Sequence, residues 1–126
     1  MKTAHDLVQE AKQDIDEISL EQADDAIKQA DLLLDVRDAD EYRQGHVPGA
    51  VNISRGLLEF KFSNDPSLEN RDMTIVLYCK TSGRAALSAK ALKQMGYRNV
   101  QSIAGGFDAW QDAGKDVAKP QLPEFD

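Results

Sequence analysis

"IVLYCKTSGRAALSAKAL", residues 75–92, joins an apolar run to a helix-like pattern through the single cysteine of the chain. An apolar run ends at Cys79, and after a short polar segment a pattern of small and apolar residues begins near Arg84. A short continuous apolar run is typical of a strand covered on both faces, and the later pattern is typical of a helix that Gly96 is placed to end. The stretch therefore predicts a buried strand, a tight turn and a helix. We call the turn, residues 79–84, the cysteine loop.

The same alternation continues on both sides of this stretch. Three more short apolar runs are candidate strands: "DLLLDVR" (31–37), "GAVNIS" (49–54) and "NVQSIAG" (99–105). Between them lie three helix-like segments: "ADEYRQG" (39–45), "RGLLEFKF" (55–62) and "FDAWQDAG" (107–114). Strands that alternate with helices favour an α/β fold, in which helices cover both faces of a mainly parallel sheet.

The two ends of the chain have patterns of their own. Residues 3–16 are expected to form an amphipathic helix that packs on the rest, because apolar residues recur there at three- and four-residue intervals: Leu7, Val8, Ala11, Ile15 and Ile18. Ser19 and Gln22 form a capping-box signature for a second helix over residues 20–30. We expect a helical extension at residues 1–17, one domain at 18–117 and a flexible tail at 118–126.

Composition limits the classes of function. The 126 residues are 41% hydrophobic and 29% charged, which is ordinary for one globular domain. A net charge of −7 without any basic run argues against binding to nucleic acid or to an anionic membrane, so an anionic substrate must be caught locally. No apolar stretch has the length of a signal peptide or a membrane span, and a cytoplasmic location is expected.

Cys79 is the only cysteine, which excludes an internal disulfide. No Cys/His cluster has the spacing of metal ligands, and we expect neither a metal nor a cofactor. In a parallel sheet, ligands bind at the carboxyl ends of strands, where Cys79 lies. The turn into a helix directs free backbone N–H groups to one point, and these groups together with nearby cations favour a thiolate over a thiol.

Cys79 is therefore the candidate nucleophile. The other residues of the cysteine loop are candidate binding residues, as backbone donors, hydroxyl donors or, for the last, a guanidinium fork for an oxyanion: Lys80, Thr81, Ser82, Gly83 and Arg84. Two other interpretations stay open, namely a buried structural cysteine and a positive turn that holds a phosphate or carboxylate without chemistry at sulfur.

Other conspicuous residues have simpler explanations. Asp35, Arg37 and Glu41 could be an acid/base set, but a structural ion-pair network at a strand end is favoured. The remaining residues are given structural roles: His46 as a hydrogen-bonding partner in a turn, Arg55 and Lys61 on a solvated face, Trp110 in the core, and Gly105 and Gly106 in the turn after the last strand.

Three motifs in order resemble those of a single-domain rhodanese, a sulfurtransferase. They are "LLLDVRDADEYRQGHVPGAVNI" (32–53), the stretch 75–92 quoted above, and "MGYRNVQSIAGGFDAW" (95–110). The resemblance covers residues 18–117. It implies a three-layer sandwich with a mainly parallel, five-stranded sheet.

The resemblance also implies an activity. The thiolate of Cys79 would take a sulfane sulfur from a donor such as thiosulfate or a cysteine desulfurase, and the persulfide would pass it to cyanide, a thiol or a partner protein. Residues 80–83 would form the cradle, and Arg84 would orient the donor anion. The chain departs from the family pattern at the fourth loop position, where many relatives have glycine and this chain has Ser82, a departure that concerns loop shape and donor preference.

A rhodanese-like fold is also compatible with two alternative functions. A cysteine phosphatase of the related dual-specificity class needs Cys-x5-Arg, normally preceded by histidine, whereas this loop is Cys-x4-Arg preceded by Tyr78. A catalytically silent interaction module commonly lacks the cysteine that this chain keeps. A carrier that delivers sulfur to one partner protein lies between these classes.

Overall fold

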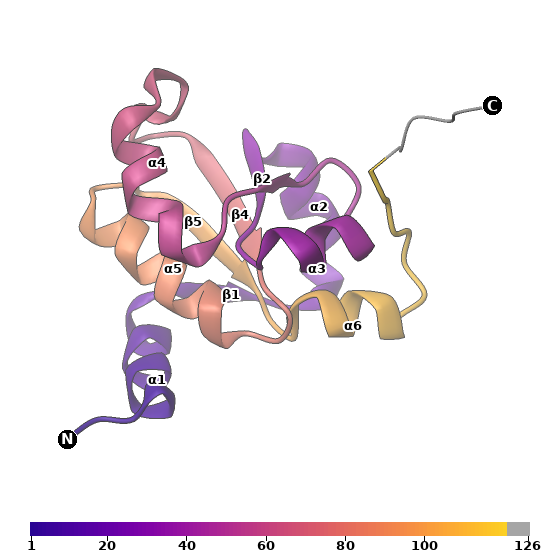
Figure 1. Ribbon diagram of the computed structural model, residues 1–126, viewed down its shortest axis with the longest axis horizontal. Helices are drawn as coiled ribbons and strands as arrows, with labels where there is room; N and C mark the ends of the chain where they lie inside the picture. Colours follow the sequence, from indigo (N-terminus) through magenta and orange to yellow (C-terminus); the bar gives the residue numbers. More distant parts are fainter. Residues whose placement is uncertain (121–126) are drawn as a thin grey trace.

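The computed structural model describes residues 1–120 and places five strands in one sheet (Figure 1). The strand order is β1-β5-β4-β2-β3, and each pair of neighbouring strands runs parallel. The mainly parallel five-stranded sheet expected from the resemblance is thus confirmed. The strands are β1 (Asp16–Ile18), β2 (Leu32–Asp35), β3 (Val51–Asn52), β4 (Thr74–Tyr78) and β5 (Asn99–Ile103).

Helices cover both faces of this sheet. The α-helices are α1 (Ala4–Asp14), α2 (Leu20–Gln29), α3 (Ala39–Gln44), α4 (Leu58–Asn64), α5 (Gly83–Gln94) and α6 (Gly106–Asp112), with 3₁₀ turns at Arg55–Leu57 and Pro66–Leu68. One face carries α4 and α5, and the other carries α2, α3 and α6, while α1 packs against α5 (Figure 1). The expected three-layer α/β architecture is confirmed. None of the helices within residues 1–120 has the length and apolar character needed to cross a bilayer.

Strand β4 shows why its sequence is apolar throughout. Ile75 and Leu77 point into the core under α4 and α5, whereas Val76 and Tyr78 point into the core under α2 and α6. Cys79 continues the first set and lies in the α5-side core. Because both faces of the strand are covered, neither set is exposed to water.

The chain entering β1 differs from the sequence expectation. Helix α1 begins at the capping box of Thr3 and Asp6, but it ends at Asp14. Ile15 is extended, and Ile18 lies in β1 opposite Ile103 of β5. Counting Ile15 and Ile18 on one helix face was therefore wrong, because strand pairing at the sheet edge overrode a local spacing that also fits a helix.

The second helix begins as expected at the Ser19–Gln22 capping box. At the other end of the chain, residues 121–126 of the expected tail lie outside the described residues. Ala118 is hydrogen-bonded to His46 through both backbone groups, at 2.8 and 2.9 Å. The division of the chain at residues 17 and 117 stays a prediction.

The turn between β5 and α6 lies against the cysteine loop. Gly106 has a φ of +57°, and a β-carbon added there would be 2.5–2.8 Å from the carbonyl oxygens of residues 79–81. The N–H groups of Phe107 and Asp108 donate to the carbonyls of Cys79 and Lys80, at 2.8 and 3.0 Å. A glycine is thus required by close approach as well as by backbone angle, a role that the sequence analysis did not assign.

We expect Gly106→Ala to destabilise the protein by about 3 kcal/mol or more, because a left-handed alanine costs about 1–2 kcal/mol and the clash adds to it. Gly114→Ala is the matched control, since Gly114 has a φ of +74° but no heavy atom within 4 Å of the added carbon. It should cost about 1–2 kcal/mol. Chemical denaturation of both variants measures the difference, and equal losses would contradict the contact with the loop.

Candidate active site

The cysteine loop joins the carboxyl end of β4 to α5. Cys79 is only 1% exposed. Within residues 1–120, the backbone N–H groups of residues 80–85 have no hydrogen-bond acceptor. The loop carbonyls of Cys79 and Lys80 are occupied by α6, and that of Ser82 accepts from Ala86 at 2.9 Å. A loop with occupied acceptors and free donors is suited to bind an anion.

Arg84 is held by Glu41 of α3. The guanidinium donates from Nη1 to Oε1 at 2.6 Å and from Nη2 to Oε2 at 3.0 Å, a bidentate pair. Glu41 therefore belongs with Arg84 and not with Asp35 and Arg37, as the sequence analysis had grouped it. This pair uses one hydrogen of Nη1 and one of Nη2. The Nε–H group and the second hydrogen of each Nη remain for a ligand.

The hydrogen bond with Arg84 lowers the pKa of Glu41, and the same bond raises the pKa of Arg84. A carboxyl whose pKa is lowered by folding contributes stability above its ordinary pKa and loses it as the pH falls through the lowered value. Glu41 therefore stays ionised, and Arg84 stays held, throughout the neutral and mildly acidic range. Both side chains are about one-third exposed, so this contribution is small.

Lys80 extends to the outside of the loop. Its ammonium lies 3.0 Å from Asp108 of α6, and its side chain is 60% exposed. A hollow of about 240 Å³ lies beside it, between α3 and α6, lined by Arg37, Glu41, Gln44, Gly45, Lys80, Phe107, Asp108 and Gln111. The structure thus gives the loop a small adjoining hollow with cations and carboxylates at its walls.

Helix α1 reaches the other side of the loop. The ammonium of Lys12 donates to the hydroxyl oxygen of Ser82 at 2.9 Å, and Val8 lies against Gly83. Thr81 is exposed. The sequence analysis missed Lys12, because its partner is 70 residues away and no local pattern connects them.

Asp35 and Arg37 form a buried ion pair, with Arg37 Nη2 at 2.7 Å from Asp35 Oδ2. Tyr78 donates its hydroxyl to the same carboxylate at 2.7 Å and accepts from the N–H of Val47 at 3.0 Å, while Arg37 also donates to the carbonyl of Gly45. Each member of the cluster is hydrogen-bonded to another part of the protein, which agrees with the structural interpretation of this pair.

The pKa values of this cluster follow from burial and charge. Burial works to lower the pKa of Arg37, but the hydrogen bond and charge of Asp35 outweigh it and raise the pKa. Burial, together with the Asp35 charge, raises the pKa of Tyr78, so its phenol stays protonated as a donor.

The structural roles given to His46, Trp110 and Lys61 are confirmed. His46 donates from Nδ1 to the carbonyl of Tyr42 at 2.9 Å and stacks on its ring at 3.7 Å. Trp110 is buried in the core under α2 and α6. Lys61 is exposed. Arg55 is only partly exposed: it pairs with Glu59 one turn later, and its Nε is buried without a hydrogen-bond partner among residues 1–120.

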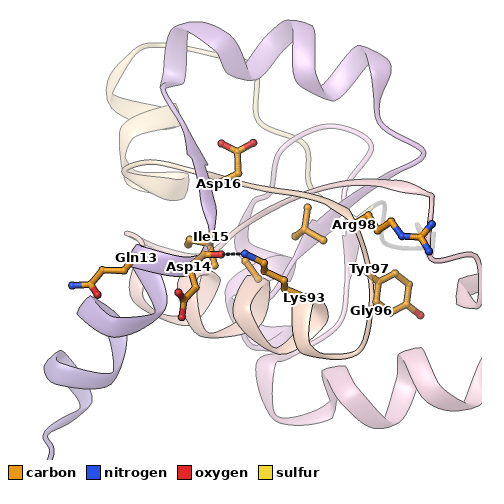
Figure 2. Close-up of a pocket in the computed structure, with 10 residues that line it drawn as sticks. Gln13, Asp14, Ile15, Asp16, Lys93, Gly96, Tyr97 and Arg98 are labelled. Atoms are coloured by element: carbon orange, nitrogen blue, oxygen red, sulfur yellow. Dashed lines mark hydrogen bonds between the residues drawn. The ribbon is translucent and has the colours of Figure 1, made fainter.

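A second hollow, of about 720 Å³, lies away from the cysteine loop (Figure 2). It is lined at the start of β1 and β5, by Asp16 and Val100 among others, whereas Cys79 follows the end of β4. In a parallel sheet these are opposite edges. Among residues 1–120 no three His, Cys, Asp or Glu side chains gather as metal ligands would.

Known proteins resemble this chain in sequence and in fold. A "Sulfurtransferase" of Allochromatium vinosum is 31% identical over 90 residues, which are 71% of this chain and 80% of that protein. A "Thiosulfate sulfurtransferase GlpE" of Pseudoalteromonas translucida is 29% identical over 76% of this chain and 89% of its own. Two further relatives are longer, and the chain spans 51% and 20% of their lengths.

A solved structure from Rhodopseudomonas palustris, of a protein of unknown function described as a "Possible Tyrosine Phosphatase", superposes with a TM-score of 0.82 at 30% identity. The match covers 94% of this chain and 96% of that one. The family model of the rhodanese-like domain matches residues 19–113, a range that holds the cysteine loop, both flanking motifs and the turn of Gly106. The chain belongs to the rhodanese-like domain family, whose members include sulfurtransferases.

Proposed function

We propose that the protein is a sulfurtransferase that works through a persulfide on Cys79. The observation that carries the proposal is the set of N–H groups of residues 80–85, which have no acceptor within residues 1–120 and begin directly after the cysteine. Such donors stabilise negative charge at a thiolate and at the outer sulfur of a persulfide. The family relatives named as sulfurtransferases support the same class of reaction.

The first half-reaction takes sulfur from an anionic donor such as thiosulfate. The thiolate of Cys79 attacks the sulfane sulfur, a new S–S bond forms, and the S–S bond of thiosulfate breaks. Sulfite leaves with the electron pair, so no oxidant or proton is needed. The exposed Lys80 and the guanidinium of Arg84 supply positive charge to a dianion that the protein's net charge of −7 would otherwise repel.

The second half-reaction regenerates the free thiolate of Cys79. The acceptor attacks the outer sulfur of the persulfide, and the Cys79 thiolate leaves. Cyanide becomes thiocyanate in this step, and a thiol becomes a persulfide. Cys79 is the only cysteine, so the acceptor must be external. The outer sulfur lies one S–S bond, about 2 Å, beyond the buried Sγ, and an acceptor therefore need not reach the cysteine itself.

A cysteine phosphatase is the competing function, since a structural neighbour is described as a possible tyrosine phosphatase. The loop argues against it. Four residues separate Cys79 from Arg84, one fewer than the phosphatase pattern given above. The preceding residue is Tyr78, whose hydroxyl is already bonded to Asp35 and Val47 and is not a base for a phosphate ester.

Intact-protein mass spectrometry after incubation with thiosulfate is the first test. We expect a thiol-reversible gain of about 32 Da on the wild type and none on Cys79→Ser, because the added sulfur sits on the thiolate. Hydrolysis of p-nitrophenyl phosphate is measured in parallel. The proposal is overturned if no adduct forms with thiosulfate, with polysulfide or with a desulfurase plus cysteine, and phosphatase activity lost in Cys79→Ser would replace it.

Arg84→Lys tests the role given to the guanidinium. Lysine keeps the positive charge but cannot donate two parallel hydrogen bonds to one anion. The kcat/KM for thiosulfate should therefore fall about 10- to 100-fold, which corresponds to the loss of one charge-assisted bidentate contact. Stability should change by less than about 1 kcal/mol, because the pair with Glu41 is partly exposed.

Arg98→Lys is the matched control for this change. Arg98 forms an ion pair with Asp72 and lines the hollow at the opposite edge of the sheet. Its replacement should leave kcat/KM unchanged. Steady-state kinetics with both variants separate the two residues, and an unaffected Arg84→Lys enzyme would contradict a role of Arg84 in donor binding.

A further inference from the structure

Helix α1 lies before residues 19–113, the part that matches the family, and yet it packs on the cysteine loop and its helix. Ala11 is fully buried, and Val8 Cγ2 would be 3.5 Å from a β-carbon on Gly83. The end of α1 is fastened to α5, because Lys93 donates to the carbonyl of Asp14 at 2.6 Å (Figure 2) and Lys90 lies 3.6 Å from the Asp14 carboxylate. The helix is therefore a fixed neighbour of the loop.

Lys12 of α1 forms a hydrogen bond with the cysteine loop. Its Nζ lies 2.9 Å from Ser82 Oγ and 3.8 Å from Glu17 Oε2, and its side chain is 29% exposed. An ammonium group only donates, so the oxygen of Ser82 must accept this bond. The hydroxyl hydrogen of Ser82 then remains to be donated, and no acceptor for it is present within residues 1–120.

This bond depends on the side chain at position 82, because only a residue with a polar side chain there could accept a hydrogen bond from the Lys12 ammonium. Ser82 has an extended φ of −161°, and its carbonyl accepts from Ala86, so its backbone is set by the start of α5. Lys12 therefore acts on the side chain of Ser82 and on the charge around the loop.

We propose that Lys12 is a positioning residue of the cysteine loop, which orients the Ser82 hydroxyl as a donor to the bound sulfur donor and favours anionic over neutral reagents at Cys79. The inference rests on the proposed function for its substrate and adds a residue outside the matched region to the site. The anions it serves are small oxyanions of sulfur, which accept a hydroxyl hydrogen bond and are attracted by a cation.

Alkylation of Cys79 measures this effect without any sulfur transfer. Iodoacetate is an anion and iodoacetamide is neutral. The rate of alkylation by iodoacetate divided by the rate with iodoacetamide therefore reports the charge at the loop. The ratio should fall about twofold to fivefold in Lys12→Gln, as expected for one partly screened charge, and should be restored in Lys12→Arg. The KM for thiosulfate should rise by a similar factor in Lys12→Gln.

Lys2→Gln is the matched control. Lys2 pairs with Glu10 of α1, and its replacement removes the same charge as Lys12→Gln. It should leave both the ratio and KM unchanged. Ser82→Ala keeps the charge of Lys12 but loses the hydroxyl, so it should raise KM and keep the alkylation ratio within about twofold of the wild type. Comparison of Ser82→Ala with Lys12→Gln separates the effect of the hydroxyl from that of the charge, and thermal unfolding checks that each variant is folded.

The outcomes distinguish this inference from the proposed function. An unchanged ratio in Lys12→Gln, or an equal fall in Lys2→Gln, overturns the role of Lys12 even if sulfur transfer proceeds. A protein that takes up no sulfur, but whose alkylation ratio depends on Lys12 and not on Lys2, loses the proposed function while the charge effect of Lys12 stands.

Discussion

The backbone contact between α6 and the cysteine loop is the constraint on which the site depends. Two N–H groups at the start of α6 are bonded to the carbonyls of Cys79 and Lys80, and Gly106 allows the helix to come that close. A peptide group whose oxygen is fixed on one side has its N–H fixed as well, since the group is planar. The orientation of the loop donors is thus determined by a helix that begins 27 residues after the cysteine.

Positive charge at the site is local and is held in place by carboxylates. Arg84 is paired with Glu41 of α3 and Lys80 with Asp108 of α6, whereas Arg37 is paired with Asp35 two residues before it. In a protein with a net charge of −7, these pairs fix where the cations stand and keep the overall field from attracting polyanions. This local arrangement is compatible with the proposed binding of a small anion at the cysteine loop in a protein that is acidic overall.

Much of the fold could be predicted from the sequence, because β4 is a short continuous apolar run and α5 is a longer pattern of small and apolar residues, with Cys79 between them. Strand β1 could not, since three residues at a sheet edge have too little pattern of their own and take their conformation from pairing with β5. The loop residues could be predicted as a group from the turn between strand and helix. The partners of Arg84 and Ser82 could not, because Glu41 and Lys12 are 43 and 70 residues away and only the folded chain brings them together.

The anchors of the cysteine loop also limit how its length can change. Residues 79 and 80 are fixed through their carbonyls to α6, and residue 82 is fixed through its carbonyl to α5 and through its hydroxyl to α1. Thr81, which is exposed, lies between these anchors. Within residues 1–120 the carbonyl of Thr81 accepts no hydrogen bond, unlike the carbonyls of the residues on either side of it, so an additional residue beside Thr81 would interrupt the fewest of these bonds. The loop can therefore be enlarged for a bulkier anion at one point, and an engineer who wishes to alter its substrate would begin there.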